Sequence, residues 1–139
     1  MRKTSATKPV DWTALVAAAR AAAARSYSPY SHYAVGAALL AEDGRVFAGC
    51  NVENASYGLT NCAERTAVFK AVSEGRRRFA ALVVAGGTDT PATPCGACRQ
   101  VLSEFCPPDM PVHIVTLPDN PAATISTTMA GLLPFAFSL

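Results

Sequence analysis

The feature that most constrains the fold is an uninterrupted apolar run, Phe79 to Ala85, which ends at Gly86-Gly87. A short apolar run that stops at a turn signal is typical of a strand buried on both of its faces. Strands of this kind lie inside sheets that are covered by helices on both sides. The run therefore predicts a central strand between two helical layers.

Three segments carry helical patterns. The Ala-rich stretch from Asp11 to about Ser26 has high helix propensity and a good N-cap residue in Asp11. Helical spacing returns from Cys62 to about Glu74, where Gly75 is a natural C-terminal cap, and again from Cys95 to about Phe105. Two of the three predicted helices therefore begin at a cysteine.

The remaining strands are predicted from shorter patterns. Tyr33 to Leu40 and Arg45 to Cys50 flank a turn sequence and form a hairpin, Val112 to Leu117 forms a fourth strand, and Ala122 to Ser126 forms a weaker fifth. This order of helices and strands predicts an α/β domain, a three-layer α/β/α sandwich with a mixed five-stranded sheet.

The length and the net charge of the chain limit the number of domains and the classes of partner that we expect. Its 139 residues suit one domain, 1–139, with a flexible tail over 1–9. Twelve Lys and Arg against ten Asp and Glu leave a net charge of +2, which is far from the basic balance of a polynucleotide-binding protein. We therefore expect a small-molecule ligand and no nucleic acid.

Nothing in the sequence predicts a membrane segment. The Ala-rich stretch is interrupted by Arg20, so no apolar run approaches the ~20 residues of a membrane-spanning helix. The polar N-terminus also lacks the apolar core of a secretory signal. We therefore expect a cytoplasmic protein that does not contact membranes.

Five cysteines in a chain without export signals indicate metal or thiol chemistry rather than disulfides. Cys95 and Cys98 are three residues apart at the start of a predicted helix, so both side chains can reach one ion. That pair alone leaves three readings open, namely a redox pair, half of a structural zinc site and part of a catalytic zinc site.

The sequence Cys62-Ala63-Glu64 offers a third thiolate and a carboxylate at another helix N-terminus. Three thiolates would leave one tetrahedral position of Zn²⁺ open, which is the property of a catalytic site, and Glu64 is then the candidate general base. Arg65 and the two helix N-termini would offset the negative charge of the thiolates. Cys50 or Cys106 could instead complete a closed site of four cysteines.

Five ordered blocks of this sequence resemble the zinc-dependent cytidine deaminases of the small, homotetrameric class. The blocks are Pro29-Tyr30-Ser31-His32-Tyr33 with Val35-Gly36-Ala37-Ala38, Asn51-Val52-Glu53-Asn54, Cys62-Ala63-Glu64-Arg65-Thr66-Ala67, Pro94-Cys95-Gly96-Ala97-Cys98-Arg99-Gln100-Val101 and Leu132-Leu133-Pro134. The resemblance runs from about Tyr30 to Phe137 and implies the deaminase fold, one Zn²⁺ per subunit and a homotetramer.

The resemblance also implies roles for particular residues. The zinc ligands would be Cys62, Cys95 and Cys98, and Glu64 would be the proton shuttle while a zinc-bound hydroxide attacks C4 of cytidine or 2'-deoxycytidine. Uridine or 2'-deoxyuridine and ammonia would leave, in a reaction of pyrimidine salvage. By the same resemblance, Asn51 and Glu53 would bind the sugar, and the backbone of Ala63 and Cys95 would bind the base. Tyr33 would lie against the bound nucleoside, and Phe137 would reach into the pocket of a neighbouring subunit. Arg65 would bond to the sulfur of a zinc ligand.

Other functions remain open at this level. A deaminase of the same fold could act on an aminonucleoside antibiotic or on cytosine in a polynucleotide. Polynucleotide deaminases usually present histidine where Cys62 stands, and the antibiotic deaminases lack the complete Asn51-x-Glu53-Asn54 motif. A binding module held together by zinc would leave Glu64 unexplained, whereas an inactive relative would keep the metal and lose turnover.

Overall fold

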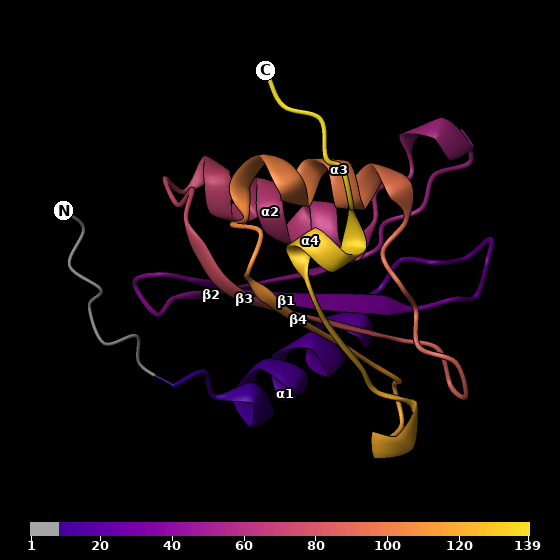
Figure 1. The fold of residues 1–139 in the computed structure, drawn as a ribbon. Coiled ribbons are helices and arrows are strands. Elements are labelled where there is room, and N and C mark those ends of the chain that lie inside the picture. Colours follow the sequence, from indigo (N-terminus) through magenta and orange to yellow (C-terminus); the bar gives the residue numbers. More distant parts are fainter. Residues whose placement is uncertain (1–8) are drawn as a thin grey trace, which may run out of the picture.

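A computed structural model describes residues 9–139, and its helices lie on both sides of one sheet (Figure 1). The strands are β1 (Val35–Ala41), β2 (Val46–Cys50), β3 (Phe79–Gly86), β4 (Pro111–Val115) and β5 (Ile125–Thr128). The helices are α1 (Trp12–Ala23), α2 (Ala63–Ser73), α3 (Gly96–Phe105) and α4 (Met129–Leu132), with short 3₁₀ turns at Tyr57–Leu59 and Pro121–Ala123. The predicted tail over 1–9 lies, except for Pro9, outside the described residues.

The sheet has five strands in the order β2-β1-β3-β4-β5. Strand β1 is antiparallel to β2 and to β3, β3 is parallel to β4, and β4 is antiparallel to β5. Helix α1 covers one face, and α2 and α3 cover the other (Figure 1). The predicted three-layer sandwich with a mixed five-stranded sheet is therefore confirmed.

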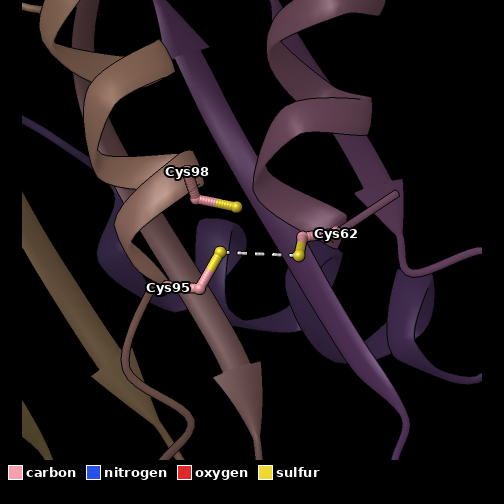
Figure 2. A group of neighbouring side chains, drawn as sticks. All are labelled: Cys62, Cys95 and Cys98. Atoms are coloured by element: carbon pink, nitrogen blue, oxygen red, sulfur yellow. Dashed lines mark hydrogen bonds between the residues drawn. The ribbon is translucent and has the colours of Figure 1, made fainter. Parts of the chain in front are cut away.

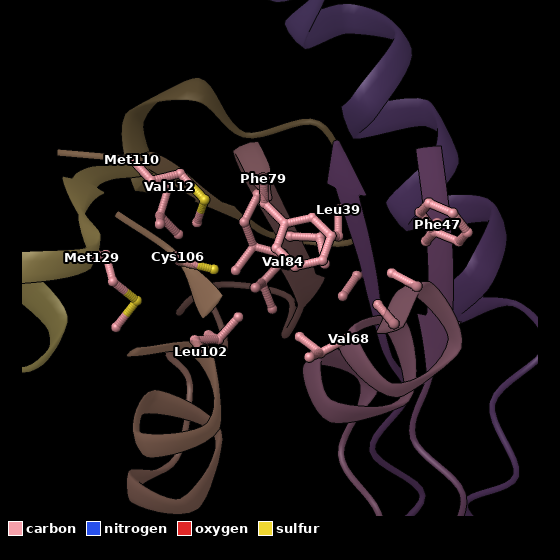
Figure 3. Packing of buried hydrophobic residues seen from close by; sticks show 14 of the residues in the cluster. Leu39, Phe47, Val68, Phe79, Val84, Leu102, Cys106, Met110, Val112 and Met129 are labelled. Atoms are coloured by element: carbon pink, nitrogen blue, oxygen red, sulfur yellow. The ribbon is translucent and has the colours of Figure 1, made fainter. Parts of the chain in front are cut away.

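Strand β3 divides the core into two halves, as the apolar run predicts. Leu82 and Val84 belong to a cluster shared with α2, α3 and α4, part of which is drawn in Figure 3. The alternate residues, Ala81, Val83 and Ala85, belong to a second cluster shared with α1. All five side chains are fully buried, which explains why this strand has no polar face.

The predicted ends of two strands are wrong. The fifth strand begins at Ile125 rather than at Ala122, because Pro121–Ala123 form a 3₁₀ turn. Proline has no N–H to give to a strand ladder and is well suited to start such a turn. At the other end of the sheet, Tyr33 lies outside the hairpin and β1 starts at Val35. Asp11 is confirmed as the N-cap of α1, since its Oδ1 accepts the N–H of Ala14 at 3.0 Å.

Among residues 9–139, no helix combines the length and the apolar composition that crossing a membrane requires.

Two glycines set the distance between the sheet and its helices. A Cβ at Gly36 in β1 would lie 1.9 Å from the carbonyl oxygen of Ala19 in α1. A Cβ at Gly49 in β2 would lie 2.6 Å from the backbone nitrogen of Ala67 in α2. Both distances are far below van der Waals contact, so the helices can pack this closely only where the strand has no side chain.

We expect Gly36→Ala to lower the free energy of unfolding by at least about 3 kcal/mol, because the new methyl group meets helix backbone that cannot move aside alone. Urea unfolding at a fixed protein concentration measures the change. Gly58→Ala is the matched control, since Gly58 has no neighbouring atom within 4 Å, and it should change stability by less than about 0.5 kcal/mol. A loss for Gly36→Ala below about 1 kcal/mol would contradict this account of the packing.

Candidate active site at the cysteine cluster

Three cysteines meet where the N-termini of α2 and α3 lie beside each other. Cys62 is the N-cap residue of α2 and Cys95 is the N-cap residue of α3, whereas Cys98 lies in the first turn of α3 and is buried. Their sulfur atoms all lie within 4.8 Å of one another and point toward a common centre (Figure 2). The fold thus brings together thiols from two separate parts of the chain.

The spacing of the sulfur atoms fits a tetrahedral metal ion. The Sγ atoms of Cys62 and Cys95 are 3.8 Å apart. Two thiolates at the usual Zn–S distance of ~2.3 Å and at the tetrahedral angle are separated by about 3.8 Å. Cys62, Cys95 and Cys98 therefore fit three ligands of one Zn²⁺, which would leave a fourth position for water or substrate.

The electrostatics of the cluster favour a bound cation. Hydrogen bonding from the Cys98 thiol, together with the Arg65 guanidinium, lowers the pKa of Cys62 to about 5. The same interaction with Cys62 raises the pKa of Cys98. One thiolate therefore forms readily, but further thiolates in the same small volume repel it and require a positive ion.

Arg65 places a positive charge directly at the cluster. Its Nη2 donates to the Sγ of Cys62 at 3.3 Å, from the first turn of the same helix. The N-terminal ends of α2 and α3 add partial positive charge at the same point. Arg65 and the helix ends together offset part of the charge that three thiolates bring to a zinc ion.

Glu64 is a buried carboxyl group beside the cluster. Only 4% of its surface is exposed, although it lies in the first turn of α2 next to a half-buried thiol. Burial is the main cause that raises its pKa to about 7, and its own backbone N–H works in the opposite direction. A buried carboxyl two residues from a metal ligand can exchange protons with a molecule that enters the site.

Cys50 and Cys106 lie apart from the cluster. Cys106 is buried in the hydrophobic core shared with Met110 and Met129 (Figure 3), and burial raises the pKa of its thiol to about 12. The Cys50 thiol donates to the carbonyl oxygen of Arg25 at 3.5 Å. Among residues 9–139, the potential metal site therefore contains three cysteines and not the four of a closed structural site.

Asn51 and Glu53 are connected to the cluster through one short bridge. Val52, which lies between them, exchanges two backbone hydrogen bonds of 2.9 Å with Asn61, the residue before Cys62. The Asn51 Nδ2 donates to the carbonyl oxygen of Tyr33 at 2.8 Å, so one of its two N–H groups is already used. Because Asn51 and Glu53 flank Val52, this pairing holds the backbone of both predicted sugar-binding residues near the N-terminus of α2.

The remaining predicted residues divide into two groups. Ala63 is the fully buried first residue of α2, and Tyr33 lies with its hydroxyl near Gly87, at the end of β3 that leads toward Cys95. Phe137, in contrast, exposes 69% of its surface beyond α4 and belongs to neither hydrophobic cluster of residues 9–139. The structure therefore places Ala63 directly after Cys62 and the Tyr33 hydroxyl near Gly87, whereas Phe137 packs in neither hydrophobic cluster of residues 9–139.

Three residues that hold the site in place were missed by sequence reasoning. Ser26 donates to the Oδ1 of Asn51 at 2.5 Å, and the Ser31 hydroxyl donates to the Oε2 of Glu53. Arg99 donates to the carbonyl oxygens of Pro94, at 2.7 Å, and Leu132, at 2.8 Å. Ser31 and Arg99 stand inside recognisable motifs, but no local pattern shows that Ser31 bonds to Glu53, 22 positions away, or that Arg99 bonds to Leu132, 33 positions away.

Comparison with known proteins agrees with this geometry. A family model described as the cytidine and deoxycytidylate deaminase zinc-binding region matches residues 11–114. The chain is 54% identical over 129 residues to the cytidine deaminase of Sporosarcina psychrophila, covering 93% of each chain. It is 47% identical over 130 residues to the cytidine deaminase of Mycobacterium tuberculosis, covering 94% of this chain and 92% of that one.

A solved structure shows the same similarity in three dimensions. The crystal structure of cytidine deaminase from Burkholderia pseudomallei superposes with a TM-score of 0.86 at 50% sequence identity, covering 92% of this chain and 100% of that chain. The family match spans most of the domain and includes all three clustered cysteines. The chain therefore belongs to the cytidine deaminase family, as a zinc-dependent deaminase whose zinc-binding region contains the Cys62, Cys95 and Cys98 cluster.

Proposed function

We propose that this protein deaminates cytidine and 2'-deoxycytidine to uridine and 2'-deoxyuridine in cytoplasmic pyrimidine salvage. One water is consumed and one ammonia is released for each nucleoside. The observation that carries the proposal is a cluster of three thiols that fits one zinc ion, with the buried carboxyl of Glu64 beside it. A structural zinc site needs no such carboxyl, whereas a hydrolytic reaction at a ring carbon needs a group that moves protons.

The proton transfers are assigned to Glu64. Its carboxylate accepts a proton from the attacking water and delivers it to N3 of the pyrimidine, then accepts a second proton from the resulting C4 hydroxyl and delivers it to the amino group that leaves from C4. Zinc, when bound, supplies the Lewis acidity that makes water nucleophilic near neutral pH. Because Glu64 is buried and next to Cys62, it can take part in all of these transfers without leaving the site.

The zinc ligands in this proposal are Cys62, Cys95 and Cys98. Arg65 holds the thiolate of Cys62 through the 3.3 Å hydrogen bond and moderates its negative charge. The backbone of Ala63 and Cys95 binds the base edge, which suits the start of a helix because the first N–H groups of a helix have no partner within it. Each helix N-terminus would thus hold both metal and substrate.

Binding of the sugar is assigned to Asn51 and Glu53, and Tyr33 is assigned to packing against the bound nucleoside. Asn51 keeps one amide N–H after its bond to Tyr33, and the carboxylate of Glu53 is an acceptor. A sugar hydroxyl that accepts from the first and donates to the second satisfies both. This pairing favours a nucleoside over a free base.

We further propose a homotetramer in which Phe137 enters the site of a neighbouring subunit. Phe137 is mostly exposed, and the aromatic side chains of Tyr30 and Tyr57 also lie open to solvent, in edge-to-face contact with each other. Exposed aromatic groups of this size favour burial against another protein surface. A second copy of this chain would supply that surface.

Glu64→Gln tests the proton shuttle. The variant should keep one zinc per chain and lose at least about a hundredfold in turnover, because the amide cannot accept a proton. Ammonia release from cytidine and zinc content by mass spectrometry are measured on the same sample. Glu104→Gln, the same change at an exposed position of α3, should behave as the wild type. A Glu64→Gln enzyme as active as the wild type would remove Glu64 from the mechanism.

Removing one thiol tests the ligand set. Cys98→Ala should carry less than about a tenth of the zinc of the wild type, since two thiolates alone do not hold the ion. Cys50→Ala should retain one zinc per chain, because the Cys50 thiol bonds to a backbone carbonyl outside the cluster. Equal zinc loss in both variants would show that the ligand set is wrong, provided that circular dichroism shows both to be folded.

Mixed subunits test the shared site. Phe137→Ala should lower kcat/KM for cytidine about tenfold, from lost aromatic contact, whereas Phe135→Ala, at a fully exposed neighbouring position, should not. Mixing Phe137→Ala with Glu64→Gln subunits should restore sites that combine an intact Glu64 with a partner's Phe137. If no activity returns in the mixture, or if sedimentation shows a fully active monomer, Phe137 does not act across an interface.

A further inference from the structure

The segment between α1 and β1 forms a clamp around the carboxylate of Glu53. The backbone N–H groups of Tyr30 and Ser31 both donate to Oε1, at 3.0 and 3.1 Å. The hydroxyl of Ser31 donates to the other oxygen, Oε2. Successive backbone N–H groups that converge on one oxygen form an anion-binding nest, and the hydroxyl closes it.

The backbone of the segment fixes which way the Ser31 hydroxyl donates. The N–H of Tyr33 donates to the Oγ of Ser31 at 3.0 Å, so this oxygen is already an acceptor and its single proton is left for Glu53. His32 between them has a φ of +56°, in the left-handed region, and its N–H closes a turn on the carbonyl oxygen of Ser28 at 3.0 Å. The turn thus holds the hydroxyl at one side of the carboxylate.

The two kinds of donor have different effects on the carboxylate. The N–H groups hold Oε1 in place, but one held oxygen still allows the carboxylate a rotation about that oxygen through combined side-chain torsions, of which the last has no sharp preference of its own. The hydroxyl of Ser31 holds Oε2 and thereby fixes this rotation. The same hydroxyl is the main cause that lowers the pKa of Glu53, so the group stays ionised and acts only as an acceptor.

We propose that Ser31 is a positioning residue for sugar recognition, whose hydroxyl fixes the Glu53 carboxylate in the orientation that accepts a hydrogen bond from a nucleoside hydroxyl. The inference rests on the proposed function, in which Glu53 contacts the sugar. Asn51 is held in a similar way, since its Oδ1 accepts from Ser26 and from the N–H of Val35. The donor and the acceptor for the sugar are thus both oriented by the segment from Ser26 to Val35.

Ser31→Ala tests the proposal because it removes the hydroxyl and keeps both backbone N–H groups. We expect the KM for cytidine to rise about tenfold while kcat stays within about twofold, since a misplaced acceptor weakens binding and leaves the proton transfers alone. Ser31→Thr, which keeps a hydroxyl, should restore the wild-type KM. Ser73→Ala is the matched control, because the Ser73 hydroxyl donates to the Lys70 carbonyl oxygen at the far end of α2.

A sugar without its 2'- and 3'-hydroxyl groups separates positioning from general damage. The ratio of kcat/KM for cytidine to kcat/KM for 2',3'-dideoxycytidine should fall about tenfold in Ser31→Ala, because the dideoxy sugar has no 2'- or 3'-hydroxyl proton to give to Glu53. A purely structural role would lower both values together and leave the ratio unchanged. An unchanged ratio, or a wild-type KM in Ser31→Ala, would overturn the proposal.

Binding of uridine to the zinc-loaded protein distinguishes this inference from the proposed function, because titration calorimetry requires no turnover. A wild type that releases no ammonia from cytidine contradicts the proposed function. If that wild type still binds uridine about tenfold more tightly than Ser31→Ala does, the positioning role of Ser31 is supported. Equal affinities, including no binding to either protein, overturn it.

Discussion

Three thiolates in one small volume repel one another, and the other groups of the site must offset this repulsion. No single helix or loop supplies enough positive charge, so the fold sets the N-termini of α2 and α3 beside each other and adds the guanidinium of Arg65. A zinc ion completes this balance. Close packing of α2 on β2, where Gly49 has no side chain, holds the first of these N-termini against the sheet. Metal binding in this protein therefore depends on helix packing as much as on the cysteines.

The same arrangement connects metal chemistry to substrate recognition. Strand β2 ends at Cys50, and the residues that follow it pair through Val52 with Asn61, directly before Cys62. The segment before β1 supplies the hydroxyl and N–H groups that orient Asn51 and Glu53. A small shift of the α2 N-terminus would consequently affect Cys62 and the proposed sugar-binding residues together. This coupling suits the proposed reaction, in which a ring carbon must be held at a fixed distance from its nucleophile.

Much of the fold could be predicted because its signals are local. The apolar run that forms β3 shows its double burial in its own composition, and Asp11 marks the start of α1 through a hydrogen bond to a residue three positions away. The start of β5 was predicted wrongly, since a weak apolar pattern did not show that Pro121 begins a 3₁₀ turn. Ser31 was missed as a partner of Glu53 for another reason. Hydrogen bonds between residues 22 positions apart leave no periodic trace in the sequence.

The sequence by itself determined which chemistry is available: thiolates three residues apart at a helix start, a third thiolate two residues before a carboxyl group, and apolar segments that must be covered on both sides. These properties depend on residue type and short spacing, so they can be read along the chain. Only the tertiary structure decided that Cys62 meets Cys95 at 3.8 Å, that Glu64 is buried beside them, and that Cys50 and Cys106 are left out. Those outcomes follow from the packing of α2 and α3 against one face of the sheet, and packing distances between separate elements are not encoded in local spacing.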